Sequence, residues 1–218
     1  MADTKSIKTN APDSNQVYPL EHHKKMVFLK NFVKNPRIIA GDYSYYDDLE
    51  TPENFEKNVL YHFDFIGDKL IIGKFCAIAS GVKFIMNGAN HRMKGFSTYP
   101  FEIFGGGWAG GTPAKEEYPY KGDTVIKNDV WVGYNSVFMP GVNVGNGSII
   151  AACSVVTKDV PDYSIVGGNP ARVIRMRFDE KVIEKLLDIS WWDWDIEKIT
   201  KYMPLISAAD ITRLEEVK

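Results

Sequence analysis

An aliphatic or aromatic residue recurs at every sixth position along two stretches of this 218-residue chain, usually with Gly or Ala directly after it. The two runs are Ile66, Ile72, Ile78 and Phe84, then Ile126, Val132, Phe138, Val144, Ile150 and Val156. Neither the period of about 3.6 residues in a helix nor the period of two in a strand produces this spacing. A six-residue period is the signature of a parallel β-helix, in which short strands stack as coils around one axis. The repeat therefore almost determines the architecture, and whatever interrupts it is the candidate site.

The repeat fails between Phe84 and Ile126, two positions that are a whole number of six-residue steps apart, so the coils can restart in phase. We predict a long loop excursion at about residues 89–122. Loops above roughly 15 residues are uncommon unless they are functional or disordered. This one holds several aromatic side chains, at Phe96, Tyr99, Phe101, Phe104 and Trp108. It is too apolar for simple disorder, so it needs a surface to pack on, either its own barrel or a neighbouring subunit.

The chain divides into three parts around this repeat. Residues 1–17 are polar and are expected to form a loosely ordered tail. Residues 18–175 are assigned to the β-helix, with 41–46 as a degenerate first coil. Residues 176–218 are predicted as a short α-helical tail, because apolar residues follow Asp179, a suitable N-cap, at helical spacing. The three tryptophans at 191, 192 and 194 are expected to fold this tail back onto a barrel face, since Trp is costly to expose.

Composition excludes several classes of partner. The net charge of −2 gives no reason to expect nucleic acid. No run approaches the roughly 20 apolar residues of a membrane span, and the N-terminus lacks a signal-peptide core. The two cysteines, Cys76 and Cys153, fall within repeat coils and are interpreted as small buried core residues in a reducing cytoplasm.

The candidate for acid–base chemistry is His91, which lies where the coil breaks. The chain has four histidines and none lies within the repeats, so we expect a metal-free mechanism and no three-histidine zinc site. A neutral imidazole is the usual group for removing a hydroxyl proton near neutral pH. Its other ring nitrogen would need a carbonyl or carboxylate partner, which the sequence does not show. The plainer interpretation is a satisfied surface histidine.

Two further motifs in the chain bear on its ligands. The glycines at 105–110 formally match G-x-G-x-x-G, but no strand precedes them and Pro113 follows where a helix should open, so we reject dinucleotide binding. Positive charge gathers where the repeats end, at Lys158, Arg172, Arg175 and Arg177. It is either a solvated basic face or an anion site for a phosphorylated cofactor.

Several segments carry a more specific pattern than the repeat. The sharpest is Asn-Gly-Ala-Asn-His-Arg-Met at residues 87–93. Others lie at 41–47, 97–101, 121–124, 128–133, 139–142, 167–171 and 177–179. On these segments the chain resembles the hexapeptide-repeat acyltransferases of the xenobiotic acetyltransferase group, in particular the streptogramin A (virginiamycin) acetyltransferases.

The resemblance implies a left-handed β-helix and a homotrimer with active sites between neighbouring prisms. It also implies acetyl-CoA as the donor and His91 as the base that takes a proton from the acceptor hydroxyl. The positions implied for acceptor binding are Tyr45, Asn90, Met93, Tyr99 and Trp131. Those implied for coenzyme A are Trp131, Ala151, Thr157, Lys158, Asn169, Pro170 and Arg172.

The expected function is O-acetylation of an antibiotic hydroxyl, with group A streptogramins ahead of chloramphenicol. A sugar hydroxyl or a non-catalytic β-helix scaffold is the alternative, and a γ-type carbonic anhydrase is not expected for want of histidines. Three departures from the family pattern bear on the acceptor: Lys94 replaces an acidic residue, Phe96 is an added residue, and residues 105–112 are rich in glycine.

Overall fold

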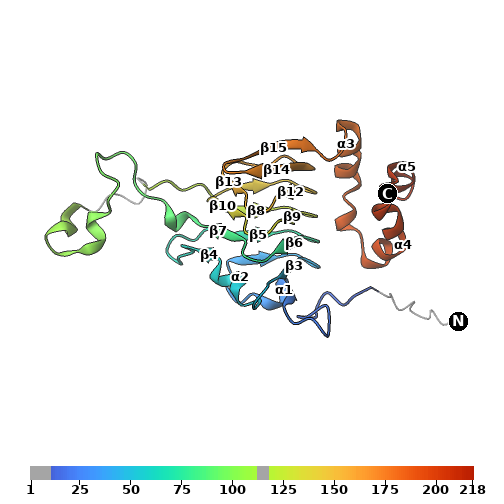
Figure 1. Ribbon diagram of the computed structural model, residues 1–218, viewed down its shortest axis with the longest axis horizontal. Helices are drawn as coiled ribbons and strands as arrows, with labels where there is room; N and C mark the ends of the chain where they lie inside the picture. The colour runs from blue at the N-terminus through green and yellow to red at the C-terminus, as the bar shows by residue number, and fades with distance from the viewer. Residues whose placement is uncertain (1–10, 112–117) are drawn as a thin grey trace, which may run out of the picture.

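The strands of this protein wind into a three-sided prism (Figure 1). The computed structural model describes residues 11–111 and 118–218, so positions 1–10 of the predicted tail and 112–117 of the predicted excursion lie outside the described residues. The strands are β1 (Met26–Phe28), β2 (Ile38–Ala40), β3 (Tyr45–Asp47), β4 (Val59–Leu60), β5 (Leu70–Ile72), β6 (Ala77–Ala79), β7 (Lys83–Ile85), β8 (Thr124–Ile126), β9 (Trp131–Val132), β10 (Val137–Phe138), β11 (Asn143–Val144), β12 (Ile149–Ile150), β13 (Val155–Val156), β14 (Ser164–Gly168) and β15 (Ala171–Met176). The helices are α1 (Leu29–Phe32), α2 (Asn54–Lys57), α3 (Glu180–Ile189), α4 (Ile196–Ser207) and α5 (Ile211–Glu215).

Each side of the prism is one sheet. The first face has the order β1-β3-β6-β9-β12-β14-β15, the second β11-β8-β5-β2 and the third β13-β10-β7-β4. Neighbouring strands within a face run parallel, except at the two ends of the first face. There β1 pairs antiparallel with β3, and β15 pairs antiparallel with β14. A β-helix of stacked coils was predicted, and the fold confirms it; the parallel faces are compatible with the left-handed winding that the resemblance implies.

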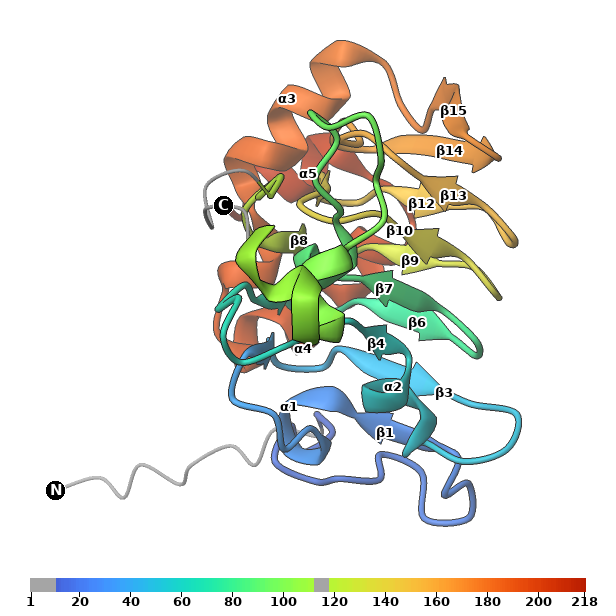
Figure 2. The ribbon, with the colours of Figure 1, turned by 90° about the vertical axis from the view of Figure 1, so that its left-hand side faces the viewer.

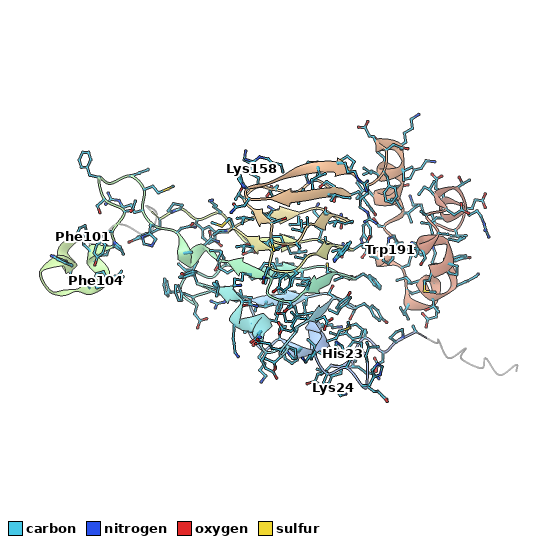
Figure 3. All side chains as sticks on the ribbon, in the orientation of Figure 1. His23, Lys24, Phe101, Phe104, Lys158 and Trp191 are labelled. Atoms are coloured by element: carbon cyan, nitrogen blue, oxygen red, sulfur yellow. The ribbon has the colours of Figure 1, made fainter. Side chains whose placement is uncertain are left out.

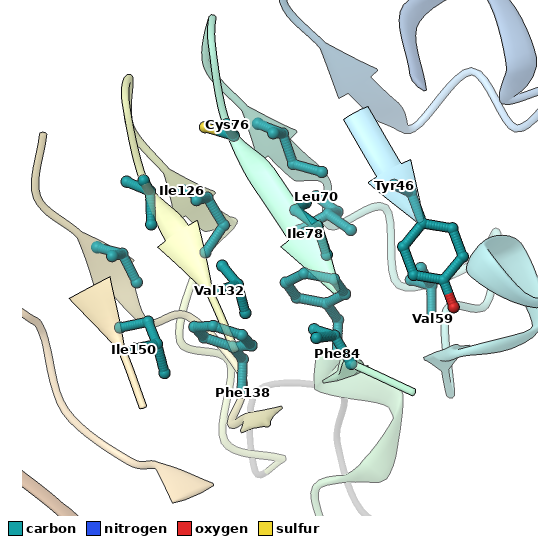
Figure 4. Close-up of a cluster of buried hydrophobic side chains, with 14 of the residues drawn as sticks. Tyr46, Val59, Leu70, Cys76, Ile78, Phe84, Ile126, Val132, Phe138 and Ile150 are labelled. Carbon is teal, nitrogen blue, oxygen red and sulfur yellow. The ribbon is translucent and has the colours of Figure 1, made fainter. Parts of the chain in front are cut away.

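The large residue of each repeat points into the prism, and the coils restart in phase after the excursion. Phe84 before the excursion lies opposite Phe138 after it, and Phe138 lies opposite Val156 in the next coil. The two phenylalanine rings stack with centroids 5.0 Å apart (Figure 4). The small residue after each core position is also explained. A Cβ on Gly73 would lie 2.7 Å from the backbone carbon of Lys127, so consecutive coils leave no room for a side chain there.

Two details differ from the prediction. Ile66 is only partly buried in a turn before β5, so the core of that coil begins at Leu70 and Ile72. Cys76 is fully buried as predicted, but the prediction for Cys153 was wrong, because this side chain is exposed. Cys153 lies at the corner between β12 and β13 with a φ of 59°, where the chain turns and its side chain leaves the core.

The segment at residues 41–46 belongs to a first coil, as predicted. β2 pairs with β5, and β3 pairs with β6 in the same parallel register as the later coils. Tyr46 lies opposite Ile78 and is fully buried, so it fills the core position of this coil on the first face.

The excursion and the C-terminal helices lie on different sides of the prism. The excursion projects away from the coils (Figure 1), and Figure 2 views it in front of them. The tail docks through Trp191, which lies between the prism and the C-terminal helices (Figure 3), as expected for the tryptophans. The Trp191 ring lies 4.9 Å from that of Phe75. Helix α3 begins at its predicted cap, since Asp179 Oδ1 accepts a hydrogen bond of 2.9 Å from Val182 N. Among the described residues, no helix is both long and apolar enough to cross a bilayer.

Candidate active site

His91 stands at the first turn of the excursion, directly after β7 and a short 3₁₀ turn at Asn87–Ala89. Its Nδ1 lies 3.0 Å from the carbonyl oxygen of Thr98. A carbonyl only accepts hydrogen bonds, so Nδ1 of the neutral ring carries the proton and Nε2 keeps its lone pair. Thr98 therefore supplies the orienting partner that the sequence did not show. A backbone carbonyl leaves no trace in the sequence, because any residue at position 98 offers one.

His91 lines a cavity of about 280 Å³ built by the excursion itself. Its walls come from Arg92, Gly95, Phe96, Ser97, Thr98, Tyr99, Pro100, Phe101, Glu102 and Tyr118. Tyr118 donates a hydrogen bond to Glu102, which holds the pKa of the Glu102 carboxyl below its usual value, and the positive charge of Arg92 acts in the same direction. The cavity thus contains an imidazole held in one orientation, a carboxylate and several aromatic side chains. Glu102 and Tyr118 were missed by the sequence analysis because their contact joins positions 16 apart within the loop.

Three of the residues predicted to bind the acceptor substrate belong to the excursion. Tyr99 lines the cavity and stacks on Phe104 with ring centroids 5.3 Å apart. Met93 is 72% exposed and is not among the lining residues. The side-chain amide of Asn90 donates to the carbonyl oxygen of Pro119 at 2.7 Å, so its nitrogen already serves a contact within the chain.

Tyr45 and Trp131, also predicted to bind the acceptor, lie instead on the first face of the prism. They line a second cavity of about 220 Å³ together with Asp47, Leu49, Ala77, Ile78, Ala79, Ser80 and Tyr134. Burial raises the pKa of the Tyr45 phenol, and Trp131 is 57% exposed. None of these residues lines the His91 cavity, so a single chain divides the predicted acceptor site into two parts.

The positions predicted for coenzyme A occupy two corners of the last coils. Ile150 lies opposite Val166, and Gly167 lies opposite Arg172, so Ala151 and Arg172 lie on either side of Gly167 at one corner. The turn that holds Asn169 and Pro170 joins β14 to β15 at this same corner. Thr157 and Lys158 directly follow β13 at the next corner, and both are exposed (Figure 3 labels Lys158).

The four residues of the predicted basic cluster do not share one environment. Arg177 turns inward: its Nη1 donates to the carbonyl oxygen of Gly147 at 2.5 Å and lies 3.7 Å from Asp129 Oδ2. Its guanidinium also lies over the rings of Tyr163 and Phe178. Arg177 therefore joins the C-terminal tail to the prism, whereas Lys158, Arg172 and Arg175 remain exposed.

The contact between Asp129 and Arg177 leads to a pH-dependent prediction. Burial raises the pKa of Asp129 from 3.8 to about 6, and Arg177 opposes that shift only in part. The folded state thus holds the Asp129 proton more tightly than the unfolded state does. This contribution to stability is complete below the unfolded pKa and is lost as pH rises through about 6.

We expect Asp129→Asn, a neutral replacement of the same shape, to gain thermal stability relative to the wild type as pH rises from about 4 to about 7. Thermal unfolding measured at intervals across this range checks the prediction. Asp188→Asn, at an exposed carboxylate paired with Lys218, is the control, and its difference from the wild type should not follow this profile. A difference for Asp129→Asn that does not vary with pH contradicts the assignment.

Two other histidines, His23 and His62, make separate local contacts. His23 Nε2 lies 3.0 Å from Asp47 Oδ1, and His62 Nε2 lies 2.8 Å from the carbonyl oxygen of Asp68. In the part of the chain that the structure describes, no three His, Cys, Asp or Glu side chains are grouped so as to hold a metal ion.

Comparison with known proteins finds a matching family and several similar enzymes. Residues 123–158 match the bacterial transferase hexapeptide family, described by six repeats. The chain is 50% identical over 206 residues to a virginiamycin A acetyltransferase of Staphylococcus aureus, a match that covers 94% of this chain and 93% of that protein. It is 57% identical over 162 residues to a probable macrolide acetyltransferase of Lysinibacillus sphaericus, over 74% of this chain and 90% of that protein. It is 43% identical over 190 residues to a chloramphenicol acetyltransferase of Agrobacterium fabrum, over 86% of this chain and 90% of that protein.

Proposed function

Because the chain belongs to the xenobiotic acetyltransferases of the hexapeptide-repeat family, we propose that it transfers an acetyl group from acetyl-CoA to a hydroxyl of an antibiotic, with group A streptogramins as the first candidates. The observation that carries this proposal is the hydrogen bond between His91 Nδ1 and the Thr98 carbonyl. It leaves His91 Nε2 as a proton acceptor in a cavity walled by aromatic side chains.

His91 performs the proton transfers of the proposed reaction. Its Nε2 takes the proton of the acceptor hydroxyl while that oxygen attacks the carbonyl carbon of the thioester. The Thr98 carbonyl, which accepts from Nδ1, stabilises the imidazolium that results. The bond between the carbonyl carbon and sulfur then breaks, and His91 returns the proton to the departing thiolate.

The acceptor class follows from the walls of the His91 cavity. Phe96, Tyr99 and Phe101 present aromatic surface, which suits a large apolar macrocycle better than a polar sugar. Chloramphenicol is the second candidate, because a relative of that name is 43% identical over 86% of this chain. We propose that coenzyme A contacts Trp131, Ala151, Thr157, Lys158, Asn169, Pro170 and Arg172, with Lys158 and Arg172 facing its phosphates.

We further propose a homotrimer whose active sites lie between subunits. The excursion carries four clustered aromatic side chains that are each 45–59% exposed, at Tyr99, Phe101, Phe104 and Trp108. Apolar surface of this kind marks an interaction site. An excursion lying against the first face of a neighbouring prism would bring His91 to Tyr45 and Trp131. We also propose a cytoplasmic location, which the two free cysteines support.

Release of free thiol from acetyl-CoA, measured with a panel of acceptors, tests this function. The panel holds a group A streptogramin, chloramphenicol, a simple sugar and serine. We expect turnover with the streptogramin and little or none with serine. Turnover with the sugar alone would overturn the proposed acceptor. Absence of acetyl-CoA binding would instead favour a non-catalytic scaffold.

A further inference from the structure

A buried carboxylate lies beneath the start of the excursion. Asp68 comes from the loop between β4 and β5 and is 0% exposed. Its Oδ2 accepts two hydrogen bonds from Asn87, one from the backbone nitrogen at 2.7 Å and one from the side-chain amide at 2.9 Å. Its Oδ1 is also buried and makes no hydrogen bond within the described residues. The hydrogen bonds that this carboxylate accepts there therefore all come from Asn87.

Asn87 in turn holds the far end of the excursion. Its side-chain amide donates to the carbonyl oxygen of Gly122 at 2.8 Å, and its Oδ1 accepts from the backbone nitrogen of Lys121 at 2.8 Å. The Asn90 amide adds the contact to Pro119 described above. The outgoing segment of the excursion at 87–90 and the returning segment at 119–122 are thus joined side by side. We call Asp68 and Asn87 the root pair.

The energetics favour a fixed geometry for this root pair. Taking an ionised carboxylate out of water is expensive unless hydrogen bonds compensate, and bonds to a charged acceptor are roughly twice as strong as neutral ones. Asn87 is only 4% exposed, so water competes weakly for these four hydrogen bonds. The loop between β4 and β5 and the two ends of the excursion are therefore held in one arrangement. Asn87, which joins them, lies four residues before His91.

We propose that Asp68 and Asn87 are positioning residues for the acetyl transfer, acting through the backbone that carries His91; this role rests on the proposed function. Neither residue lines the His91 cavity. A base that must reach a hydroxyl proton depends on its placement, and a displacement of about 1 Å can lower a rate by about 10²-fold.

The test compares Asp68→Asn and Asn87→Ala with Asp64→Asn. Asp64 is an exposed carboxylate in the same loop, paired with Arg37, and its variant is the matched control. We expect kcat for acetyl transfer to fall by about 10- to 100-fold in both root-pair variants, with the KM for acetyl-CoA unchanged. The control should keep wild-type kcat. A wild-type kcat in Asn87→Ala would overturn the proposal.

Amide hydrogen exchange provides a readout that does not depend on activity. The backbone nitrogen of Lys121 donates to Asn87, so peptides covering 118–123 should exchange faster in Asn87→Ala, while peptides covering β12 and β13 should not change. Faster exchange without a loss of kcat would overturn the positioning role. Faster exchange throughout the coils in both variants would assign the pair to fold stability and overturn it equally. Failure of the proposed function is distinguishable, because the wild-type protein itself would then release no thiol from acetyl-CoA with an antibiotic acceptor, whatever the exchange shows.

Discussion

Replacing His91 with Ala should lower kcat for acetyl transfer by at least about 10²-fold while the thermal unfolding midpoint stays near that of the wild type. General-base catalysis typically contributes about 10²- to 10⁴-fold, and this variant removes the base entirely. The imidazole is exposed and is hydrogen-bonded to the Thr98 carbonyl, so its loss removes little packing. Steady-state kinetics with saturating acetyl-CoA and a streptogramin acceptor measure the effect.

His22→Ala is the matched control, because His22 is an exposed histidine outside both cavities. It should retain wild-type kcat. The KM for acetyl-CoA in His91→Ala should also stay close to the wild-type value, since the proposed coenzyme A positions lie on the prism rather than on the excursion. A His91→Ala variant that keeps half or more of the wild-type kcat would remove the imidazole from the mechanism.

Mixed trimers of two inactive variants should recover about one third of wild-type activity, if each active site takes His91 from one subunit and Trp131 from its neighbour. The prediction follows from the two separate cavities of the single chain. Trp131→Ala should be strongly impaired alone, because Trp131 is proposed to contact both acceptor and coenzyme A. Any trimer that contains both His91→Ala and Trp131→Ala chains has one site in three in which both residues are intact.

The experiment co-expresses the two variants with different affinity tags and purifies the trimers that carry both tags. Trimers of two differently tagged His91→Ala chains are the control and should stay inactive. A site built within one subunit predicts no recovery in the mixed trimers, because no chain then carries both residues intact. Mass measurement of the purified species reports the oligomeric state in the same preparation.

Much of the fold could be predicted from the chain because its information is local and repeated. Each coil needs a large apolar side chain pointing inward and a small residue where the next coil passes, and these demands recur with a fixed spacing. Phe84 and Phe138 show how far this reaches: their shared phase correctly predicted that the coils would restart in register across the excursion. Asp179 likewise marked the start of α3, because an N-cap needs only a side chain next to its own helix.

The errors arose where a side chain's direction depends on the path of the backbone. Cys153 sits at a corner with positive φ and is exposed, although Ser154 directly after it is buried. Arg177 has the charge expected of an anion site, but it follows β15 and turns back onto Asp129 and Tyr163. Neither outcome is encoded in residue type, because both depend on which way the chain runs after a strand ends.

The sequence by itself determined the repeating prism, the place where it is interrupted and the histidine at that interruption, since each of these depends on residues close together in the chain. Only the tertiary structure decided what holds that histidine and what surrounds it. The root pair at Asp68 and Asn87 joins segments that are distant in sequence, and so does each of the two cavities that share the acceptor residues. The Thr98 carbonyl reaches His91 only because the excursion folds back on itself. Such contacts follow from how the coils and the excursion lie in space, and no local pattern of residues specifies them.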